Sequence, residues 1–359
     1  MSFLDDPPIQ QTQGAARNFS HWNDSITNET VICIKYGVEV VTFPLYRAML
    51  CVQIGFCLSS LVLLLLVLTK YQQKLIFSYD VRASFISLLL ASLLHASVVA
   101  FFDSYQFVLS FTFNTPCDVF LPRAFYIVFH MPLMYSILWI EASQIVMLFG
   151  RFLTTFSLVR REKQNKTSGK IMFLTSLFIP FMALLALYSG ENFDVPQINV
   201  LNTPQTLTSR INMMFISIII LNTIGLPALI TMHIYSKRKS KRAEGLRSRF
   251  QCAQEINSSL LIISLTALQI IIFFAYSSCM FYLRMTFRPS EDSLAIFRSK
   301  IIAGYLVHVH TLLLPLITMG FLWRMKQERR STIKSMLKVK STGAEGWANY
   351  ASQLNQQWS

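Results

Sequence analysis

Charged residues are scarce in this sequence. Only 14% of its 359 residues are Asp, Glu, Lys or Arg, whereas a soluble globular domain carries about 25%. Hydrophobic residues make up 53% of the chain, and the mean hydropathy is +0.45. Acidic residues are fewer than basic residues, which leaves a formal net charge of +14. This composition indicates a protein whose main solvent is lipid.

The basic balance does not indicate nucleic-acid binding. Such binding uses a basic patch on one face of a domain. Here the Lys and Arg residues lie in short segments between long apolar runs. We therefore expect no nucleic-acid partner.

Cysteines and catalytic motifs are also sparse. The six cysteines are scattered and form no C-x-x-C pair, which argues against a disulfide scaffold and a zinc site. The sequence contains no H-E-x-x-H, G-x-S-x-G or P-loop motif and no paired intramembrane carboxylates, so we expect neither an enzyme nor a cofactor. Residues 1–30 are polar, and we expect no cleavable signal peptide.

Long apolar runs are what the sequence has in abundance. Each is about 18 to 26 residues long, which is the length of a membrane-spanning helix. The runs cover residues 49–69, 83–102, 124–149, 171–188, 211–235, 258–283 and 301–323. They predict an all-α membrane protein with a seven-transmembrane helix bundle over 45–323, preceded by an arm (1–44) and followed by a tail (324–359).

The charge distribution orients this bundle. Most of the 32 Lys and Arg residues follow the first, third, fifth and seventh runs, and short loops rich in Lys and Arg stay in the cytoplasm. The third run, for example, ends at Arg151 and continues into a basic segment. We therefore expect an extracellular N-terminus and a cytoplasmic C-terminus.

Two kinds of extracellular modification follow from this orientation. Three N-x-S/T sequons, at Asn18, Asn23 and Asn28, lie close together in the arm and predict glycosylation. Cys33 and Cys117 are the two cysteines that the topology leaves outside the lipid on the extracellular side. Because that compartment is oxidising, we expect a disulfide between them.

One acidic residue, Glu141, stands in the middle of an apolar run. A carboxylate at that depth costs several kcal/mol unless it is paired, protonated or open to water, so such residues usually face the bundle interior and mark a function. A protonated Glu that only joins two helices is the structural alternative. His95, His308 and His310 are its candidate partners.

The His308-Val309-His310 sequence resembles a metal-ligand pair but does not predict one. Residues two apart on a helix point about 200° from each other, so the two rings cannot hold one ion as an i, i+4 pair does. We expect no metal site and assign one of these histidines to a polar cavity lining.

Three helix-internal prolines and two basic segments leave alternatives open. Pro180, Pro227 and Pro315 are either hinges or static kinks. Residues 236–242 are a charge run that attracts acidic lipids. Residues 324–338 suit either a helix on the inner membrane face or a simple topological anchor.

Short motifs along nearly the whole chain resemble the nematode serpentine chemoreceptors of class alpha (Sra) and their alpha-beta-like relatives. Two of them flank the third and sixth helices, where 147–156 is similar to a Glu-Arg-x-x-Ala-Thr-Phe motif and 247–251 to an Arg-Tyr-Gln element. The others are Cys33, Phe43-Pro44-Leu45-Tyr46, Lys74-Leu75-Ile76-Phe77, His95 and Cys117-Asp118. Gly150 departs from the pattern by replacing the acid beside Arg151, as does Gln254-Glu255 in place of Glu-Asn.

The resemblance implies a G-protein-coupled chemosensory receptor in the plasma membrane or cilium of a sensory neuron. A small-molecule or peptide ligand, a heterotrimeric G protein and the bilayer would be its partners. Arg151, Arg247 and Arg249 would couple to the G protein, while the ligand cavity would contain four residues: Glu141, His95, Tyr135 and His308. Gly150 is expected to weaken the restraint on Arg151 and raise basal activity. A ligand-gated channel or carrier that uses Glu141, and more weakly a membrane enzyme, are the alternatives.

Overall fold

The structure is a computed structural model that describes residues 33–71, 79–156, 165–194, 197–201, 203–241, 246–286, 306–337 and 344–358. Within these ranges the backbone is helical apart from connecting loops and one isolated antiparallel bridge between Leu121 and Gln197. The three sequon asparagines lie outside them.

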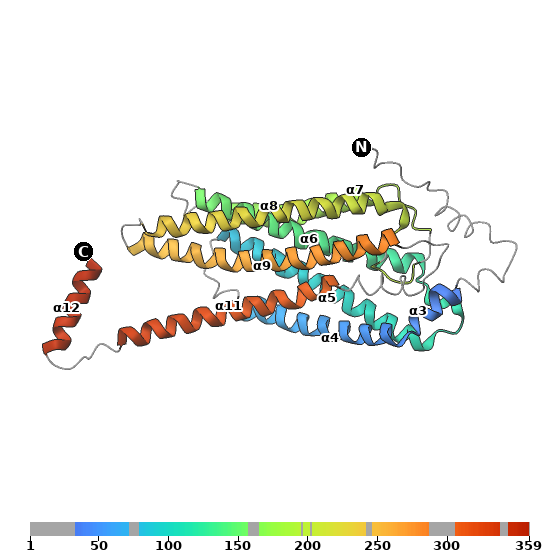
Figure 1. The fold of residues 1–359 in the computed structure, drawn as a ribbon, viewed down its shortest axis with the longest axis horizontal. Helices are drawn as coiled ribbons and strands as arrows, with labels where there is room; N and C mark the ends of the chain where they lie inside the picture. Colours follow the sequence, from blue (N-terminus) through green and yellow to red (C-terminus); the bar gives the residue numbers. More distant parts are fainter. Residues whose placement is uncertain are drawn as a thin grey trace. The chain divides into compact units, whose positions relative to one another are not determined.

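Seven helices of the described chain are long and apolar enough to cross a membrane, one over each predicted run (Figure 1). They are α4 (Pro44–Leu66), α5 (Tyr79–Thr112), α6 (Arg123–Phe156), α7 (Asn165–Tyr188), α8 (Thr208–Lys241), α9 (Leu246–Thr286) and α11 (Leu306–Leu337). This confirms the predicted fold class.

Several of these helices are longer than the apolar runs. At 34 residues and 1.5 Å per residue, α5, α6 and α8 are each about 50 Å long, against a hydrocarbon layer of about 30 Å. Hydropathy detects only the part of a helix that lipid surrounds. The helices also continue through Pro180, Pro227 and Pro315, as α6 does through Pro132.

The third spanning helix, α6, is the most buried. In its apolar part 78% of the residues are buried inside the protein, whereas the corresponding share in α8 is 24%. It packs against α5, α7 and α8, while α5 also packs against α4 and α7, and α8 packs against α9. Side chains on α6 are therefore in a position to connect most of the bundle.

The contacts divide the chain into two compact units, residues 1–315 and 316–359. The boundary follows Pro315 inside α11, which continues as one helix to Leu337. Residues 324–337 of the basic segment thus continue the seventh helix, which differs from a separate helix on the inner membrane face, one of the two alternatives that the sequence left open. No Pro or Gly interrupts the chain between Gly320 and Gly343, so nothing local ends the helix. The second unit also contains α12 (Ala344–Trp358).

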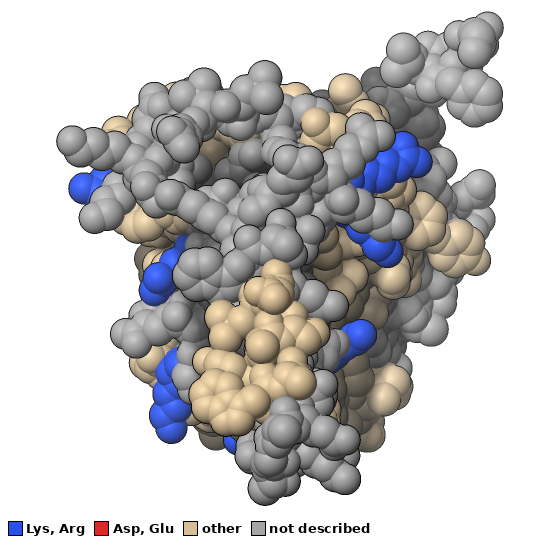
Figure 2. Space-filling view, turned by 90° about the vertical axis from the view of Figure 1, so that its left-hand side faces the viewer, with Lys and Arg blue, Asp and Glu red and all other residues tan. Residues whose placement is uncertain are grey.

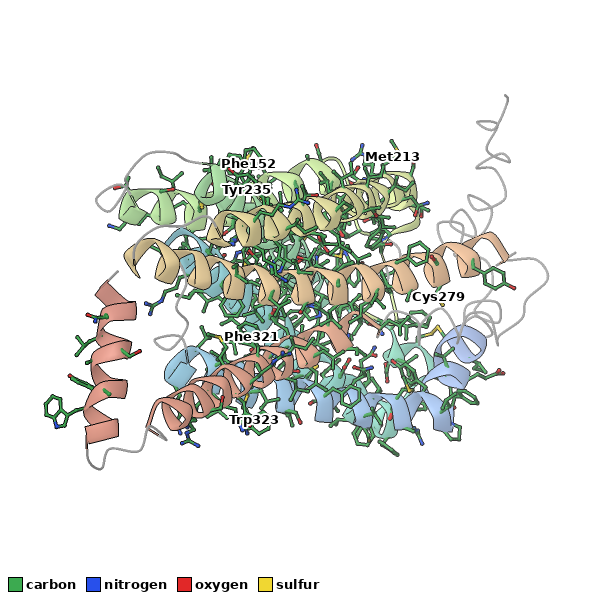
Figure 3. The ribbon with its side chains drawn as sticks, turned by 60° about the vertical axis from the view of Figure 1, so that its left-hand side comes forward. Phe152, Met213, Tyr235, Cys279, Phe321 and Trp323 are labelled. Carbon is green, nitrogen blue, oxygen red and sulfur yellow. A yellow bond between two sulfur atoms is a disulfide. The ribbon has the colours of Figure 1, made fainter. Side chains whose placement is uncertain are left out.

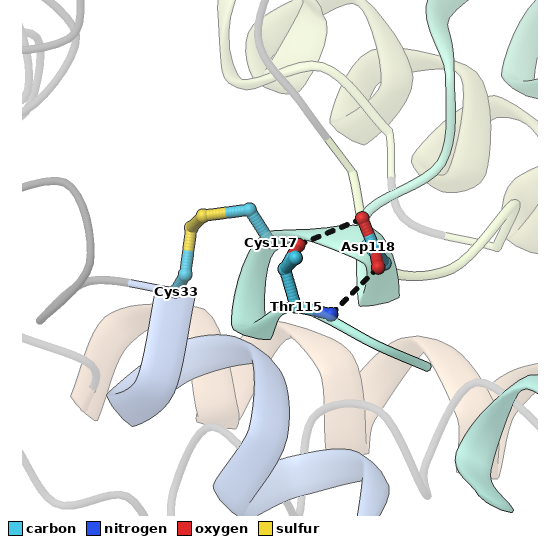
Figure 4. The surroundings of a disulfide bond; sticks show 4 residues. All are labelled: Cys33, Thr115, Cys117 and Asp118. Carbon is cyan, nitrogen blue, oxygen red and sulfur yellow. Dashed lines mark hydrogen bonds between the residues drawn. A yellow bond between two sulfur atoms is a disulfide. The ribbon is translucent and has the colours of Figure 1, made fainter. Parts of the chain in front are cut away.

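A disulfide joins the arm to the segment before α6. Cys33 begins a π-helical turn (η1, Cys33–Val38), and Cys117 lies in a 3-10 turn (η4, Pro116–Val119) (Figure 4). Their sulfur atoms are 2.01 Å apart. Since disulfides persist in oxidising compartments, the bond supports the extracellular assignment of this end.

The η4 turn is stabilised by Asp118. Its carboxylate accepts hydrogen bonds from the backbone N–H groups of Thr115 (2.7 Å) and Asn114 (3.2 Å), and from the Thr115 hydroxyl (2.8 Å) (Figure 4). These bonds, that from the Thr115 N–H foremost, lower the pKa of Asp118 below its ordinary value because they favour the ionised form.

The loop after α7 folds back onto the outer end of the bundle without a disulfide. The N–H of Leu121 donates to the Gln197 carbonyl (2.8 Å). Further along, the side chain of Gln106 on α5 donates to the carbonyl of Ile198. Ile198 and Val200 are almost fully buried. Hydrogen bonds to backbone carbonyls, rather than a disulfide, thus hold this loop on the bundle.

Candidate functional site

A chain of hydrogen bonds between buried polar groups connects α5, α6 and α11 in the bundle interior. Nδ1 of His95 lies 2.9 Å from the Ser136 hydroxyl, and Nε2 of His95 lies 2.9 Å from Nδ1 of His308. All three side chains are fully buried. The structure therefore brings together two of the predicted cavity residues, His95 and His308.

The direction of these hydrogen bonds follows from the serine. The Ser136 hydroxyl donates to the Leu133 carbonyl (2.6 Å), so it accepts from His95. A neutral His95 that donates through Nδ1 accepts through Nε2, and His308 then donates from its own Nδ1. If His95 gained a proton at Nε2, that nitrogen would donate instead and the hydrogen bond to His308 would reverse, so the protonation of His95 sets the direction of the bond between α5 and α11.

Other buried polar side chains lie on the helices around this chain. Glu141 is 3% exposed on α6. Within the described part of the chain, neither ring nitrogen of the buried His310 has a hydrogen-bond partner, and the same holds for the side-chain amides of Gln144 and Gln269. Buried groups of this kind normally bind a partner or ordered water. The interior therefore offers polar groups to a ligand.

Tyr135 lies elsewhere. Its hydroxyl donates to the carbonyl of Leu177 on α7 (3.2 Å), and its ring contacts Trp139 with 5.7 Å between centroids. The side chain lines a surface cleft along α7. The structure therefore does not place Tyr135 beside His95 and His308, as the sequence predicted. Consecutive residues on a helix point about 100° apart, and Ser136 rather than Tyr135 faces the histidines.

A second polar cluster, which sequence reasoning missed, holds α5, α6 and α7 together. The Ser176 hydroxyl donates to the Phe173 carbonyl (2.7 Å), so Ser87 donates to Ser176 (2.7 Å). Ser87 in turn accepts from the Trp139 indole (2.8 Å) and from Ser143 (3.1 Å). Small polar residues within apolar runs were the available signal, since they connect helices in membranes.

Arg151 is buried at the inner end of α6, with 2% of its surface exposed. Its guanidinium donates to the hydroxyl of Ser259 on α9. Phe152 and Tyr235 mark this end in Figure 3, and Met213 marks the opposite end of α8. Arg247 and Arg249 lie near the start of α9, but their side chains are outside those described.

The structure places the two histidines of the His308-Val309-His310 sequence in different surroundings. No group of three or more His, Cys, Asp or Glu side chains that could hold an ion occurs among the residues that the structure describes. His308 and His310 occupy different surroundings, since His308 bonds to His95 while His310 lies against Phe273, with 6.3 Å between ring centroids.

Seven apolar helices in the described part of the chain, with buried polar side chains on several of them, define a seven-transmembrane membrane protein. Residues 34–359 match the family model described as serpentine type 7TM GPCR receptor class ab chemoreceptor, and the chain belongs to this family. The class alpha resemblance is corrected to class ab, because the short motifs that carried it do not separate one class from another.

The curated relatives agree with this family. Serpentine receptor class beta-17 of Caenorhabditis elegans is 31% identical over 294 residues, which cover 80% of each chain. Serpentine receptor class beta-16 of the same organism is 24% identical over 72% of this chain and 79% of its own. Class beta-1 is 24% identical over 89% of this chain and 95% of its own.

Family membership gives the general function. The protein is a chemoreceptor of the seven-transmembrane, G-protein-coupled type, and it is a multi-pass protein of the plasma membrane. G-protein coupling is the general function of the family, whose members are receptors rather than enzymes.

Proposed function

We propose that the buried histidine chain is the floor of the ligand cavity. His95, Ser136 and His308 form this chain, and Glu141 lies near it in sequence on α6. The observation that supports this proposal is that the histidine chain joins α5, α6 and α11 by hydrogen bonds, and the direction of these bonds depends on which ring nitrogens are protonated. A small molecule that hydrogen-bonds to one ring would shift the relative stability of two helix arrangements.

In this proposal the cytoplasmic end of the bundle activates the G protein. Arg151, together with Arg247 and Arg249, contributes to the surface that a heterotrimeric G protein contacts. Because Arg151 is buried against Ser259, α9 must separate from α6 before the guanidinium becomes accessible. Outward movement of such a helix is a rigid-body change of the kind that switching proteins use. A sensory neuron, including its cilium, is the proposed site of action.

The test is a ligand screen that reports G-protein activation in a heterologous cell. With an active ligand in hand, Arg151→Ala should abolish the evoked signal, while His95→Ala should raise the ligand concentration needed for a half-maximal signal. Surface expression must persist in both variants. Arg123→Ala is the control, because it removes an exposed arginine at the opposite end of α6. An unchanged response of the Arg151 variant would remove the assigned role.

A further inference from the structure

An amphipathic cleft lies between the beginnings of α5 and α7, and neither the histidine chain nor Arg151 is among the residues that line it. It has a volume of about 560 Å³, within the range of ligand sites. Its lining includes the basic residues Arg82 and Lys170 and the apolar residues Ile86, Phe173 and Leu174. The lining includes two cationic side chains and no acidic one.

The position of the cleft matches the membrane interface. The spanning parts of α5 and α7 begin at Val81 and Thr167, so Arg82 and Lys170 lie within one turn of the predicted cytoplasmic surface. Leu174 is one turn deeper than Lys170. Figure 2 views the end at which α7 begins, where basic side chains are visible and no acidic side chain appears among the described residues.

A second apolar cleft extends the first along α7. Leu174 lines both, and Phe178 and Phe181 continue the second cleft, whose volume is about 570 Å³. From Lys170 to Phe181 the helix rises by about 16 Å, at 1.5 Å per residue. A basic end followed by an apolar track of this length matches a phosphate group followed by an acyl chain.

The helices around the cleft are held close together. A Cβ atom on Gly169 would lie 2.5 Å from the Tyr79 ring, so only glycine permits this approach of α7 to α5. About two turns further along each helix, Ser87 and Ser176 are joined by their hydroxyl groups at 2.7 Å. The cleft is therefore preformed by helix packing rather than by mobile loops.

We propose that this cleft binds an anionic phospholipid of the cytoplasmic leaflet. Its phosphate lies between Arg82 and Lys170, and an acyl chain follows Leu174 toward Phe181. Negatively charged lipids are concentrated in that leaflet, and basic pockets between spanning helices bind their headgroups. The bound lipid would stabilise the packing of α5 against α7.

The experiment measures lipid adducts on the full-length receptor by native mass spectrometry in detergent. The probes are phosphatidylserine, a phosphatidylinositol phosphate, phosphatidylcholine, a sterol and a soluble inositol phosphate. Anionic lipids should bind more tightly than phosphatidylcholine or the sterol. The Arg82→Ala/Lys170→Ala variant should lose about 30-fold in affinity for them, from two basic contacts.

Two further variants separate this site from general surface charge and from headgroup binding. Lys237→Ala/Arg238→Ala removes the same charge from an exposed part of α8, where attraction to acidic lipids comes from general surface charge, and should lower affinity much less than the Arg82→Ala/Lys170→Ala variant does. Leu174→Ser should weaken lipid binding without affecting the soluble inositol phosphate. Because Lys170 and Leu174 are exposed, substitutions at these two positions should leave thermal unfolding of the lipid-free receptor unaltered. Arg82 is half-buried, so Lys170→Ala alone gives a second test if the double variant does not fold.

The proposal is overturned if the Arg82→Ala/Lys170→Ala and Lys237→Ala/Arg238→Ala variants lose equal affinity for anionic lipids. It is also overturned if the soluble inositol phosphate binds as tightly as the lipid. The same holds if phosphatidylcholine or the sterol binds as tightly as the anionic lipids. The measurement requires neither an agonist nor a G protein. Its outcome is therefore independent of the proposed signalling roles of His95 and Arg151.

Discussion

The guanidinium of Arg151 on α6 donates a hydrogen bond to the hydroxyl of Ser259 on α9, and both side chains are almost fully buried. The sequence suggested that Arg151 lacks a restraint, since Gly150 stands where an acid is expected beside it. The structure provides a different partner from a neighbouring helix. This bond ties α6 to α9 at the end where coupling is proposed.

Removing this bond should raise basal signalling. In Ser259→Ala the arginine loses an acceptor in the resting arrangement, and a hydrogen bond to a charged group contributes about 1.5–3 kcal/mol. If the active arrangement lacks the bond, the ratio of active to inactive receptor should rise about tenfold or more. Ligand-independent G-protein activation, normalised to surface expression, measures this change.

Ser264→Ala is the matched control on the same helix. Its hydroxyl is exposed and donates to the Leu260 carbonyl four residues earlier, so it links no other helix. Basal activity should stay at the wild-type level in this variant. Equal basal activity in the Ser259 variant and the wild type would show that Ser259 does not restrain Arg151.

The sequence predicted the elements that periodicity and charge determine. Seven apolar runs gave seven spanning helices, and topology singled out Cys33 and Cys117, which the structure joins. The sequence did not predict which side chains form contacts between helices. A Glu or His within an apolar run signals burial, but His95 pairing with His308 across 213 positions depends on packing that no local pattern specifies. Arg247, Arg249 and the three sequons remain predictions.

Loss of the disulfide should destabilise the outer end of the receptor. The bond closes a loop of 84 residues, for which chain entropy gives at most about 4–5 kcal/mol. The membrane already limits how far α4 and α5 separate, so the measured loss should be smaller. Cys33→Ser, Cys117→Ser and the double variant should lower the thermal midpoint equally, because each removes the same bond.

Additive losses in the double variant would mean that the cysteines act separately. Cys51→Ser is the control, because Cys51 is an exposed free cysteine on α4. It should leave the thermal midpoint and surface expression unchanged.

Asp118 should make the η4 turn sensitive to strong acid only. Its folded-state pKa is lowered, so the stabilisation is fully present above the ordinary value of 3.8 and is lost as the pH falls through the folded-state pKa. Asp118→Asn should therefore lower the thermal midpoint at pH 5 to 8 by a constant amount, and the difference from wild type should shrink below about pH 4. A difference that changes between pH 5 and 8 would point to another group.

His130 should hold the loop after α7 onto the bundle. Its Nδ1 donates to the Val200 carbonyl (2.5 Å), so its Nε2 accepts from the Tyr188 hydroxyl (2.5 Å). His130→Phe retains a ring of similar size but leaves two buried groups without this partner, at about 1–3 kcal/mol each. Hydrogen–deuterium exchange should become faster at the Leu121 amide, which bonds to the same loop at Gln197.

Two variants sharpen this test of the loop anchor. Tyr188→Phe removes only one of the two bonds of His130 and should have a smaller effect on exchange. Arg123→Ala breaks the ion pair with Asp194. The Arg123 side chain is 60% exposed and that of Asp194 is 66% exposed, and an exposed pair of this kind contributes less than about 1 kcal/mol to stability. If exchange at Leu121 in His130→Phe matched that of Arg123→Ala, the ion pair and the buried histidine would contribute equally. Since the loop depends on buried carbonyls, we expect the histidine variant to exchange faster than either control.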